Sequence, residues 1–422
     1  MSSASEVSIT SRLTGCFDSC YLTGSTRRLP PAVVQATKKP RKTHGMKQRK
    51  KSITKPYNIF CEFAQWAGGW REQMISEKRN VIVAPFPRTM NEIFSERDLK
   101  RLASFANVLW AEDRELPAAV LENLLPETWA FIAFSPPMTT ERLRLSWQLK
   151  AILEVGGHFP PTIDYRECFA RGVRVLSCAP AFGRQVAEMA LSMSLASIRG
   201  LVPAHVAFTK GEEEWQGDRP SDFSLFGQDV GFVGFGSIAR QLLQLLKPFG
   251  CRIWVTDPWI PESIIRVAGC EPATLEQVMS TGRVIYVLAT PAPENLGLIS
   301  REQIERMQPG ALLVLISRAH LVDFVALVDA ADKGKIQAAI DVFPTEPVPL
   351  DATVRNVKNT ILSPHRAASI RRERQAIGRM VVDDLEVMAN GLPPSLMQIA
   401  QPEIIDRRIG PAASGPTAQR TK

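Results

Sequence analysis

The sequence lacks several features that would place it in other protein classes. No run of apolar residues approaches the roughly 18 that a membrane span needs. The N-terminus has no apolar core of the kind found in secretory signals. The seven cysteines are an odd number, and no two of them form a C-x-x-C pair. A disulfide framework is therefore not expected, and reduced thiols in the cytoplasm fit the pattern better.

The chain also has little net charge outside its N-terminal segment. Residues 1–79 contain 15 Lys/Arg and 5 Asp/Glu, whereas the rest of the chain contains 36 Lys/Arg and 38 Asp/Glu. The excess positive charge behind the net charge of +8 therefore lies in the N-terminal segment. We predict a disordered basic tail over 1–75 and no nucleic-acid-binding face on the folded part. Three other interpretations of the tail stay open: sequence upstream of a later start at Met46 or Met74, a transit peptide, or an electrostatic tether.

Alternating strand and helix patterns begin at Asn80. Strands are expected within 80–86, 129–135, 150–157 and 172–179, and a helix over 95–105 begins after Ser95 as its N-cap. This alternation predicts a parallel α/β layer domain of the flavodoxin-like type. A long helical run over 183–201 is expected to connect this domain to a second one.

A second series of patterns begins at Asp229. Six predicted strands alternate with helices up to residue 365, which is typical of a Rossmann-type doubly wound parallel sheet. A last helix over 371–391 ends at Gly391 before a Pro pair and is expected to return to the first domain. We therefore predict these divisions: tail, 1–75; first α/β domain, 78–190; doubly wound domain, 191–366; returning helix, 367–402; loose tail, 403–422.

The segment 229–257 carries a dinucleotide-binding fingerprint. A strand enters Gly234-x-Gly236-x-x-Ala239, a helix follows, and a second strand ends in Asp257. Gly234 permits the tight turn, Gly236 lets the backbone approach a pyrophosphate, and Ala239 keeps the helix close to the strand. The free N–H groups at the start of the helix, at Ser237 and Ile238, favour phosphate. An α/β domain that only resembles this motif is the alternative.

The end of the second fingerprint strand indicates which cofactor is bound. Asp257 is placed to accept hydrogen bonds from both hydroxyls of an adenosine ribose, and its charge would repel a 2′-phosphate. Neither Pro258 nor Trp259 offers a cation to such a phosphate. The sequence therefore predicts NAD rather than NADP.

The order of four segments resembles the D-isomer-specific 2-hydroxyacid dehydrogenases. These segments are the fingerprint, "ISRAHLVDFVAL" (316–327), "AAIDVFPTEP" (338–347) and "LSPH" (362–365), and "RQVAEMAL" (184–191) resembles the family's connector helix. The resemblance covers roughly 80–400 and implies an NAD-dependent oxidoreductase acting on a small D-2-hydroxy acid or its 2-keto form. It also implies a homodimer, and Arg318, Glu346 and His365 match the family's catalytic residues.

The chemistry of these three residues suits that reaction. His365 follows a strand at the edge where open α/β sheets bind ligands, and an imidazole can carry a proton in either direction near neutral pH. Glu346 would fix its tautomer, and the planar fork of Arg318 matches a carboxylate. Taken singly, Arg318 reads as a surface charge, Glu346 as a turn residue and His365 as a solvated side chain.

Further cofactor and substrate contacts are expected around this triad. The expected cofactor contacts are Gly234, Gly236, Ser237, Ile238, Asp257, Ile316, Ser317, Arg318, Asp341 and His365. The expected substrate contacts are Gly157, His158 and Arg318, and no metal site is expected. Asp341 is expected to face the nicotinamide amide, with an ordinary strand-end acid as the alternative.

The chain departs from the family at three places. Leu315 and Ala319 replace the family's usual Asn and Gly around the arginine, and Ala is strained only where φ is positive. The loop "EVGGHFPPTID" (154–164) has Phe159 in place of a glycine, and the family binds its substrate's carboxylate partly through backbone N–H groups there. The loop "AFSPPMTT" (133–140) is also unlike the family's. The identity of the acid therefore stays open, as does the role of His320.

Two other function classes fit the same sequence. One is a cofactor-sensing binding protein like the corepressor relatives of the family, to which the basic tail gives some weight. The other is a scaffold that binds NAD without turnover. Turnover of keto acids with NADH separates both from an enzyme.

Overall fold

The structure is a computed structural model that describes residues 57–58, 78–215, 217 and 222–409. These residues belong to one compact unit spanning 55–422. Most of the basic tail predicted over 1–75 lies outside the described residues. Within it, Tyr57–Asn58 form a short strand, β1, so the prediction of disorder is wrong at that point.

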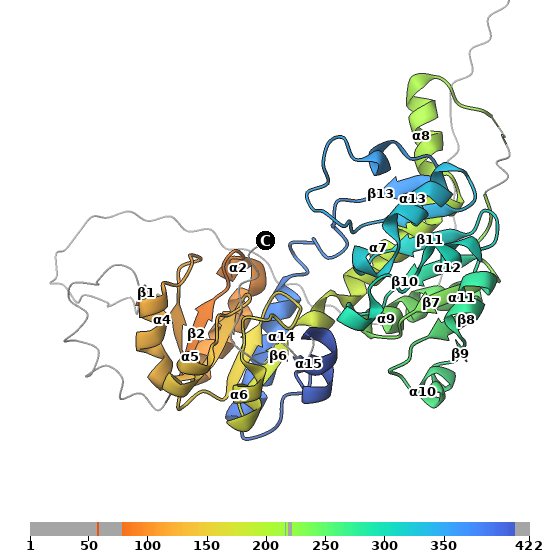
Figure 1. Cartoon of the computed structure of the whole chain (residues 1–422). Helices are drawn as coiled ribbons and strands as arrows, with labels where there is room; N and C mark the ends of the chain where they lie inside the picture. The colour runs from red at the N-terminus through yellow and green to blue at the C-terminus, as the bar shows by residue number, and fades with distance from the viewer. Residues whose placement is uncertain (1–56, 59–77, 216, 218–221, 410–422) are drawn as a thin grey trace, which may run out of the picture. The chain divides into compact units, whose positions relative to one another are not determined.

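The first domain is built on a seven-stranded sheet (Figure 1). Its strands are β1, β2 (Arg79–Ala84), β3 (Ala106–Trp110), β4 (Thr128–Ala133), β5 (Ala151–Glu154), β6 (Arg174–Ser177) and β14 (Gln398–Ile399). Their order is β1-β3-β2-β4-β5-β6-β14, with β14 antiparallel to β6 and the other neighbours parallel. Counted along the chain from β2, the five central strands run 2-1-3-4-5. That order confirms the predicted flavodoxin-like fold.

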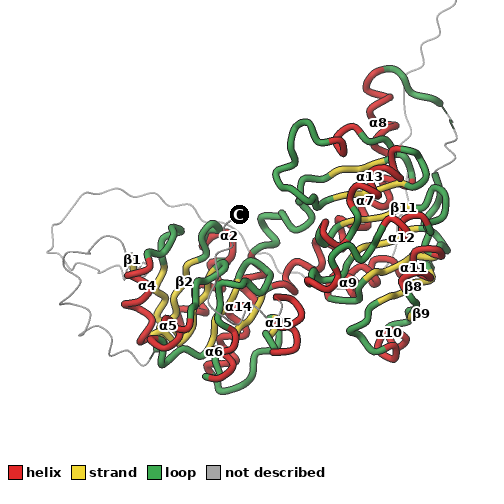
Figure 2. The backbone as a smooth tube through the Cα atoms, viewed as in Figure 1, coloured by secondary structure: helices red, strands yellow, loops and turns green. Residues whose placement is uncertain are grey.

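Helices cover both faces of this sheet because each strand sends alternate side chains to opposite sides. The helices are α2 (Met90–Ile93), α3 (Glu96–Phe105), α4 (Ala118–Leu124), α5 (Thr140–Leu145), α6 (Tyr165–Ala170), α14 (Gln375–Ala389) and α15 (Pro402–Ile409). Ile82 and Phe131 are buried in one apolar layer with residues of α4, α5, α6 and α15. Val81 and Ile132 are buried in the other with residues of α2, α3 and α14. Figure 2 shows the backbone of these helices beside the strands of the sheet.

The second domain is built on a parallel sheet, also of seven strands. Its strands are β7 (Asp229–Val233), β8 (Arg252–Thr256), β9 (Glu271–Pro272), β10 (Val284–Val287), β11 (Leu312–Leu315), β12 (Gln337–Ile340) and β13 (Thr360–Leu362). The order β13-β12-β11-β10-β7-β8-β9 corresponds to 3-2-1-4-5-6 with a seventh strand added. This is the predicted Rossmann-type topology. The order in which successive strands are added to the sheet reverses between β7 and β10, and such sheets bind ligands at this point.

The second sheet is also covered on both faces. Its helices are α7 (Gly183–Ile198), α9 (Ser237–Leu246), α10 (Glu262–Val267), α11 (Leu275–Thr281), α12 (Arg301–Glu305) and α13 (Phe324–Asp332). Phe232 and Val314 pack with α7 and α9 on one face, whereas Ile285 and Leu313 pack with α11, α12 and α13 on the other.

The connector predicted as one helix over 183–201 is confirmed as α7, which ends slightly earlier, at Ile198, and a second helix follows it. Gly200 takes a φ of +54° between α7 and α8 (Leu201–Lys210) and breaks the run. In the described part of the chain no single helix is long and apolar enough to cross a membrane. The segments Ala179–Ile198 and Leu201–Lys210 pass that test only together, with a bend of 59°.

Further elements differ from the sequence predictions. Strands β3 and β14 were not predicted, and β9 makes a seventh strand where six were expected. The returning helix begins at Gln375 rather than at residue 371. The tail predicted to be loose from 403 begins instead with α15, because Ile405 is 6% exposed in the apolar layer over the first sheet. Residues 410–422 of that predicted tail lie outside the described part.

Candidate active site

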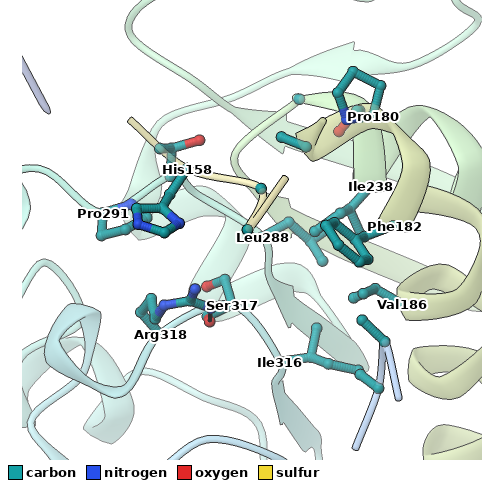
Figure 3. A pocket seen from close by; sticks show the side chains of 18 of the residues that line it. His158, Pro180, Phe182, Val186, Ile238, Leu288, Pro291, Ile316, Ser317 and Arg318 are labelled. Carbon is teal, nitrogen blue, oxygen red and sulfur yellow. Dashed lines mark hydrogen bonds between the residues drawn. The ribbon is translucent and has the colours of Figure 1, made fainter. Parts of the chain in front are cut away.

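A cavity of about 890 Å³ is lined by loops from the carboxyl ends of strands in both sheets. The first domain contributes Arg88 after β2 and the loop 156–159 after β5. The second domain contributes the turns after β7, β10, β11, β12 and β13. Figure 3 shows His158 and Arg318 lining the pocket from these two domains. Open α/β sheets bind ligands at such edges, and the volume suits a cofactor or small-molecule site.

The two glycines of the fingerprint meet different surroundings. Gly234 has a φ of +99°, and a Cβ there would lie 2.5 Å from the backbone of Ala289, so only glycine fits. A Cβ on Gly236 would meet no heavy atom within 4 Å. Gly236 lines the cavity at the N-terminus of α9, so its missing side chain leaves open space beside free N–H groups. Ser237 and Ile238, the first residues of α9, line the cavity too.

Asp257 closes the fingerprint from the end of β8. Its Oδ2 accepts a hydrogen bond from the Phe235 N–H at 2.7 Å, and its Oδ1 accepts one from the Trp259 N–H at 2.9 Å. The carboxylate thus holds the glycine turn in place. Asp257 also lines a second cavity of about 640 Å³, which shares Gly236 with the first. Arg407 of α15 lines this cavity and lies 5.4 Å from the centre of the Trp259 ring system.

Arg318 follows β11 and lines the main cavity together with Ile316 and Ser317. Its Nη1 donates to the Ser317 carbonyl oxygen at 2.7 Å, which leaves most of the guanidinium donors free for a ligand. The hydroxyl of Ser317 is buried and has no hydrogen-bond partner in the described part of the structure. Ala319 does not have a positive φ, so its Cβ causes no strain where the family has glycine.

The structure brings His365 and Glu346 together. His365 Nδ1 lies 2.6 Å from Glu346 Oε2, and Glu346 Oε1 accepts the Phe343 N–H at 2.9 Å. Burial alone would raise the pKa of Glu346. The hydrogen bonds from His365 and Phe343, with the charges of His365 and Arg318, outweigh this effect and lower the pKa below its ordinary value. The acid is therefore an ionised partner for the imidazole at neutral pH.

Asp341 fixes the loop that carries His365. Its side chain is buried, and its two oxygens accept the Arg366 N–H at 2.8 Å and the Ala367 N–H at 3.1 Å. Its carbonyl oxygen accepts the N–H of His365, whose φ is +50°. Asp341 also lines the cavity, so a cofactor contact stays a prediction, but the structure gives its carboxylate a role in positioning the loop.

In the first domain, Glu154 organises the loop that the sequence singled out. This buried acid ends β5, and its Oε1 accepts the Gly156 N–H at 2.6 Å. Its Oε2 accepts the N–H groups of Gly157 at 2.7 Å and His158 at 3.0 Å. Gly157 and His158 both line the cavity, and His158 Nε2 lies 3.1 Å from the Ser135 hydroxyl oxygen.

Sequence reasoning missed Arg88 and Arg407, which line these cavities, and Glu154, which holds the loop 156–158. Glu154 had a detectable signal, since an acid within an apolar run, two residues before a pair of glycines, needs partners. Arg88 and Arg407 had none, because each reaches its cavity through the tertiary fold. His320, left without a role, is not among the residues lining the cavity. Burial and the charge of Arg318 lower the pKa of its imidazole.

These residues fit NAD. The space beside Gly236 admits a pyrophosphate, the buried Ser317 hydroxyl lacks a partner, and Asp257 lies at the ribose position of the fingerprint. Among the described residues, no group of three or more His, Cys, Asp or Glu is arranged to hold a metal ion.

Comparisons with known proteins agree with this geometry. Residues 191–367 match the model of the NAD-binding domain of D-isomer specific 2-hydroxyacid dehydrogenases. The crystal structure of a phosphoglycerate oxidoreductase from Rhizobium etli is 37% identical, with a TM-score of 0.70, over 77% of this chain and 99% of that one.

Two curated relatives differ in how much of their length is matched. A D-3-phosphoglycerate dehydrogenase of Methanocaldococcus jannaschii is 31% identical over 54% of this chain, but the match spans only 44% of that relative. A glyoxylate reductase of Korarchaeum cryptofilum is 27% identical over 72% of this chain and 92% of the relative. The chain thus spans about half the length of the first relative and nearly all of the second. With the fingerprint, the triad positions and the 37% identical structure in agreement, the chain belongs to the D-isomer-specific 2-hydroxyacid dehydrogenase family.

Proposed function

We propose that the protein is an NAD-dependent oxidoreductase that interconverts a small D-2-hydroxy acid and its 2-keto acid. The observation that carries this proposal is the His365–Glu346 pair on the cavity edge that also bears Arg318 and the fingerprint. The bound nicotinamide supplies or accepts the hydride at the carbon that bears the oxygen. The residues of the chain hold the acid and move the proton.

Each member of the triad has one task. Arg318 binds the carboxylate through its planar fork and places positive charge near the carbonyl oxygen as that oxygen becomes negative. His365 donates a proton to this oxygen during reduction and removes it during oxidation. Its Nδ1 is held by Glu346, so Nε2 is the nitrogen that faces the substrate. Glu346 fixes the tautomer and the orientation of the imidazole through this contact.

The test follows the absorbance of reduced nicotinamide with glyoxylate, hydroxypyruvate, pyruvate and phosphohydroxypyruvate. We expect turnover with at least one of them. His365→Asn should lower kcat by about 10²- to 10⁴-fold while NADH binding persists. NADH binding without turnover of any acid would favour the cofactor-sensing or scaffold alternatives. Full activity in His365→Asn would remove the mechanism.

We also propose a homodimer and a cytoplasmic location. In support of a second subunit, α8 exposes apolar side chains such as Leu201 and Phe208, each about three-fifths exposed. In support of a reducing compartment, Cys168, Cys178, Cys251 and Cys270 are free thiols. Light scattering of the purified chain tests the first proposal, and localisation of a tagged full chain tests the second.

A further inference from the structure

The loop 156–158 has no free backbone donors for a ligand. Its three N–H groups all donate to the carboxylate of Glu154, which is fully buried beneath them. A backbone N–H donates one strong hydrogen bond, so these three are already satisfied. An anion next to residues 156–158 must therefore be bound by groups other than these N–H donors.

Arg88 is the side chain placed to do this. It follows β2, at the point where the strand order of the first sheet reverses, and it lines the same cavity as Arg318 and His365. Its guanidinium lies 5.7 Å from the centre of the Phe134 ring and 5.4 Å from that of Phe182. These two rings hold it in a defined position through cation–π contacts.

The charge of Arg88 is not neutralised by a direct ion pair. Its Nη1 donates to the Val155 carbonyl oxygen, and no carboxylate in the described part of the chain lies within 4 Å of it. Nearby Glu154 is committed to the loop N–H groups, and burial keeps the neighbouring Cys178 thiol protonated by raising its pKa. Desolvation also lowers the pKa of Arg88, which shows that burying this charge is costly.

A second cation lies on the same side but already has a partner. Arg374, at the start of α14, lines the cavity and donates to Glu92 Oε1 at 3.2 Å. Its charge is thus balanced, whereas that of Arg88 is not. Half-buried cations are stabilised by a bound anion, and the planar fork of arginine suits a carboxylate or a phosphate equally.

On these grounds we propose that the substrate is a 2-keto or 2-hydroxy acid with a second anionic group, and that Arg88 binds this second group. Arg318 then holds the carboxylate next to the reacting carbon, and Arg88 holds the far end of the molecule. The inference rests on the proposed function, because it assumes that Arg318 and His365 act on the same ligand.

The experiment compares matched keto acids with NADH as reductant. Oxaloacetate is paired with 2-oxobutanoate, and phosphohydroxypyruvate with hydroxypyruvate, so each pair differs in the second anion. We expect kcat/KM to favour the doubly acidic member of one pair by about tenfold or more, because charge-assisted hydrogen bonds contribute at this level. The pair that shows the preference tells a carboxylate from a phosphate.

Variants of Arg88 then test the residue. Arg88→Met should lower the preference ratio by about 10- to 100-fold, and Arg88→Lys should keep part of it. Arg97→Met, at an exposed position on α3, is the matched control and should leave the ratio unchanged. If Arg88→Met does not fold, the preference ratios of the native chain and of Arg88→Lys still test the proposal.

Two results would overturn the inference alone, and a third would overturn the proposed function on which it rests. Equal kcat/KM within both pairs would show that no second anion is recognised, although the proposed function would stand. Equal loss of activity on all four acids in Arg88→Met would make Arg88 a support of the fold. Absence of turnover with every acid, despite NADH binding, would instead overturn the proposed function itself.

Discussion

Glu346 is the residue through which we expect pH to act on the proposed reaction. Its pKa is lowered: burial opposes the shift, but the hydrogen bonds from His365 and Phe343 prevail. Because the folded-state pKa lies below that of the unfolded chain, the pair stabilises the fold above the ordinary carboxyl range. This contribution is lost as the pH falls through the lowered value. The side chain is 35% exposed, so solvent screening keeps the contribution small.

Replacing Glu346 by Gln is therefore expected to change catalysis more than stability. At neutral pH kcat should fall by about tenfold or more, because the negative charge of the carboxylate next to His365 Nδ1 is lost. The amide oxygen that replaces it is a weaker hydrogen-bond acceptor. The acid limb of the pH profile that reports protonation of Glu346 should disappear. Steady-state rates across the pH range measure both effects. Glu302→Gln, an exposed acid on α12, is the control. A wild-type profile in Glu346→Gln would contradict this role.

Replacing Glu154 is expected to have the opposite effect, a loss of stability of the fold. It is fully buried and accepts four backbone hydrogen bonds, the fourth from the Ser135 N–H at 3.5 Å, so Glu154→Ala leaves four N–H groups without this partner. We expect a loss of about 3 kcal/mol of unfolding free energy, measured by urea titration. Glu154→Gln, which keeps one acceptor oxygen, should lose less. Glu96→Ala on the exposed face of α3 should leave the unfolding curve unchanged. Equal stability of Glu154→Ala and the native chain would refute the network.

At the scale of elements, the sequence patterns predicted what local chemistry determines. The capped helix after Ser95, the βαβ unit around Gly234 and Gly236, and the six strands from 229 to 362 were all recognisable from periodicity and turn residues. The patterns missed β9, because two residues with a proline have no strand signature. They missed β3 because it follows α3 directly, without a turn signal between them.

The site was predictable to a similar extent. Arg318, Glu346 and His365 follow predicted strands, so topology alone brings them to one edge. The partners of Asp341 and Asp257 were not predictable, because both carboxylates bind backbone N–H groups whose positions depend on loop geometry. The tail from 403 was misjudged for a comparable reason: α15 is held by burial of Ile405 against the first domain, which no local pattern reveals.

The returning helix α14 gives a prediction whose sign depends on tertiary packing. Replacing Gly by Ala inside a helix normally stabilises it by about 1 kcal/mol. A Cβ on Gly378, however, would meet the Ile93 carbonyl oxygen and lie 2.8 Å from the Phe94 Cα. We therefore expect Gly378→Ala to destabilise the fold by about 1–3 kcal/mol in urea titration. The exposed Arg379→Ala is the control on the same helix. A more stable Gly378→Ala would show that α14 does not pack closely on α2.

The whole molecule places two reversal points of strand order around one cavity. In the second sheet the reversal between β7 and β10 carries the fingerprint, and in the first sheet the reversal between β2 and β4 carries Arg88. On our proposals, the same topological rule supplies a cofactor side and a substrate side. Because the chain enters the second domain through α7 and returns through α14, changes in either domain can be detected in the stability of the whole chain.

Cofactor binding should therefore raise the stability of the entire chain by mass action. At an NADH concentration of about 100 times Kd, the unfolding free energy should rise by about 2.7 kcal/mol. Gly236→Val should abolish most of this gain, because its side chain fills the space left for the pyrophosphate. Its stability without cofactor should stay unchanged, since a Cβ there meets no heavy atom within 4 Å. Gly234→Ala should instead destabilise the cofactor-free chain, because its Cβ would lie 2.5 Å from Ala289 backbone atoms. Thermal unfolding with and without NADH distinguishes the two, and a full NADH-dependent shift in Gly236→Val would place the cofactor elsewhere.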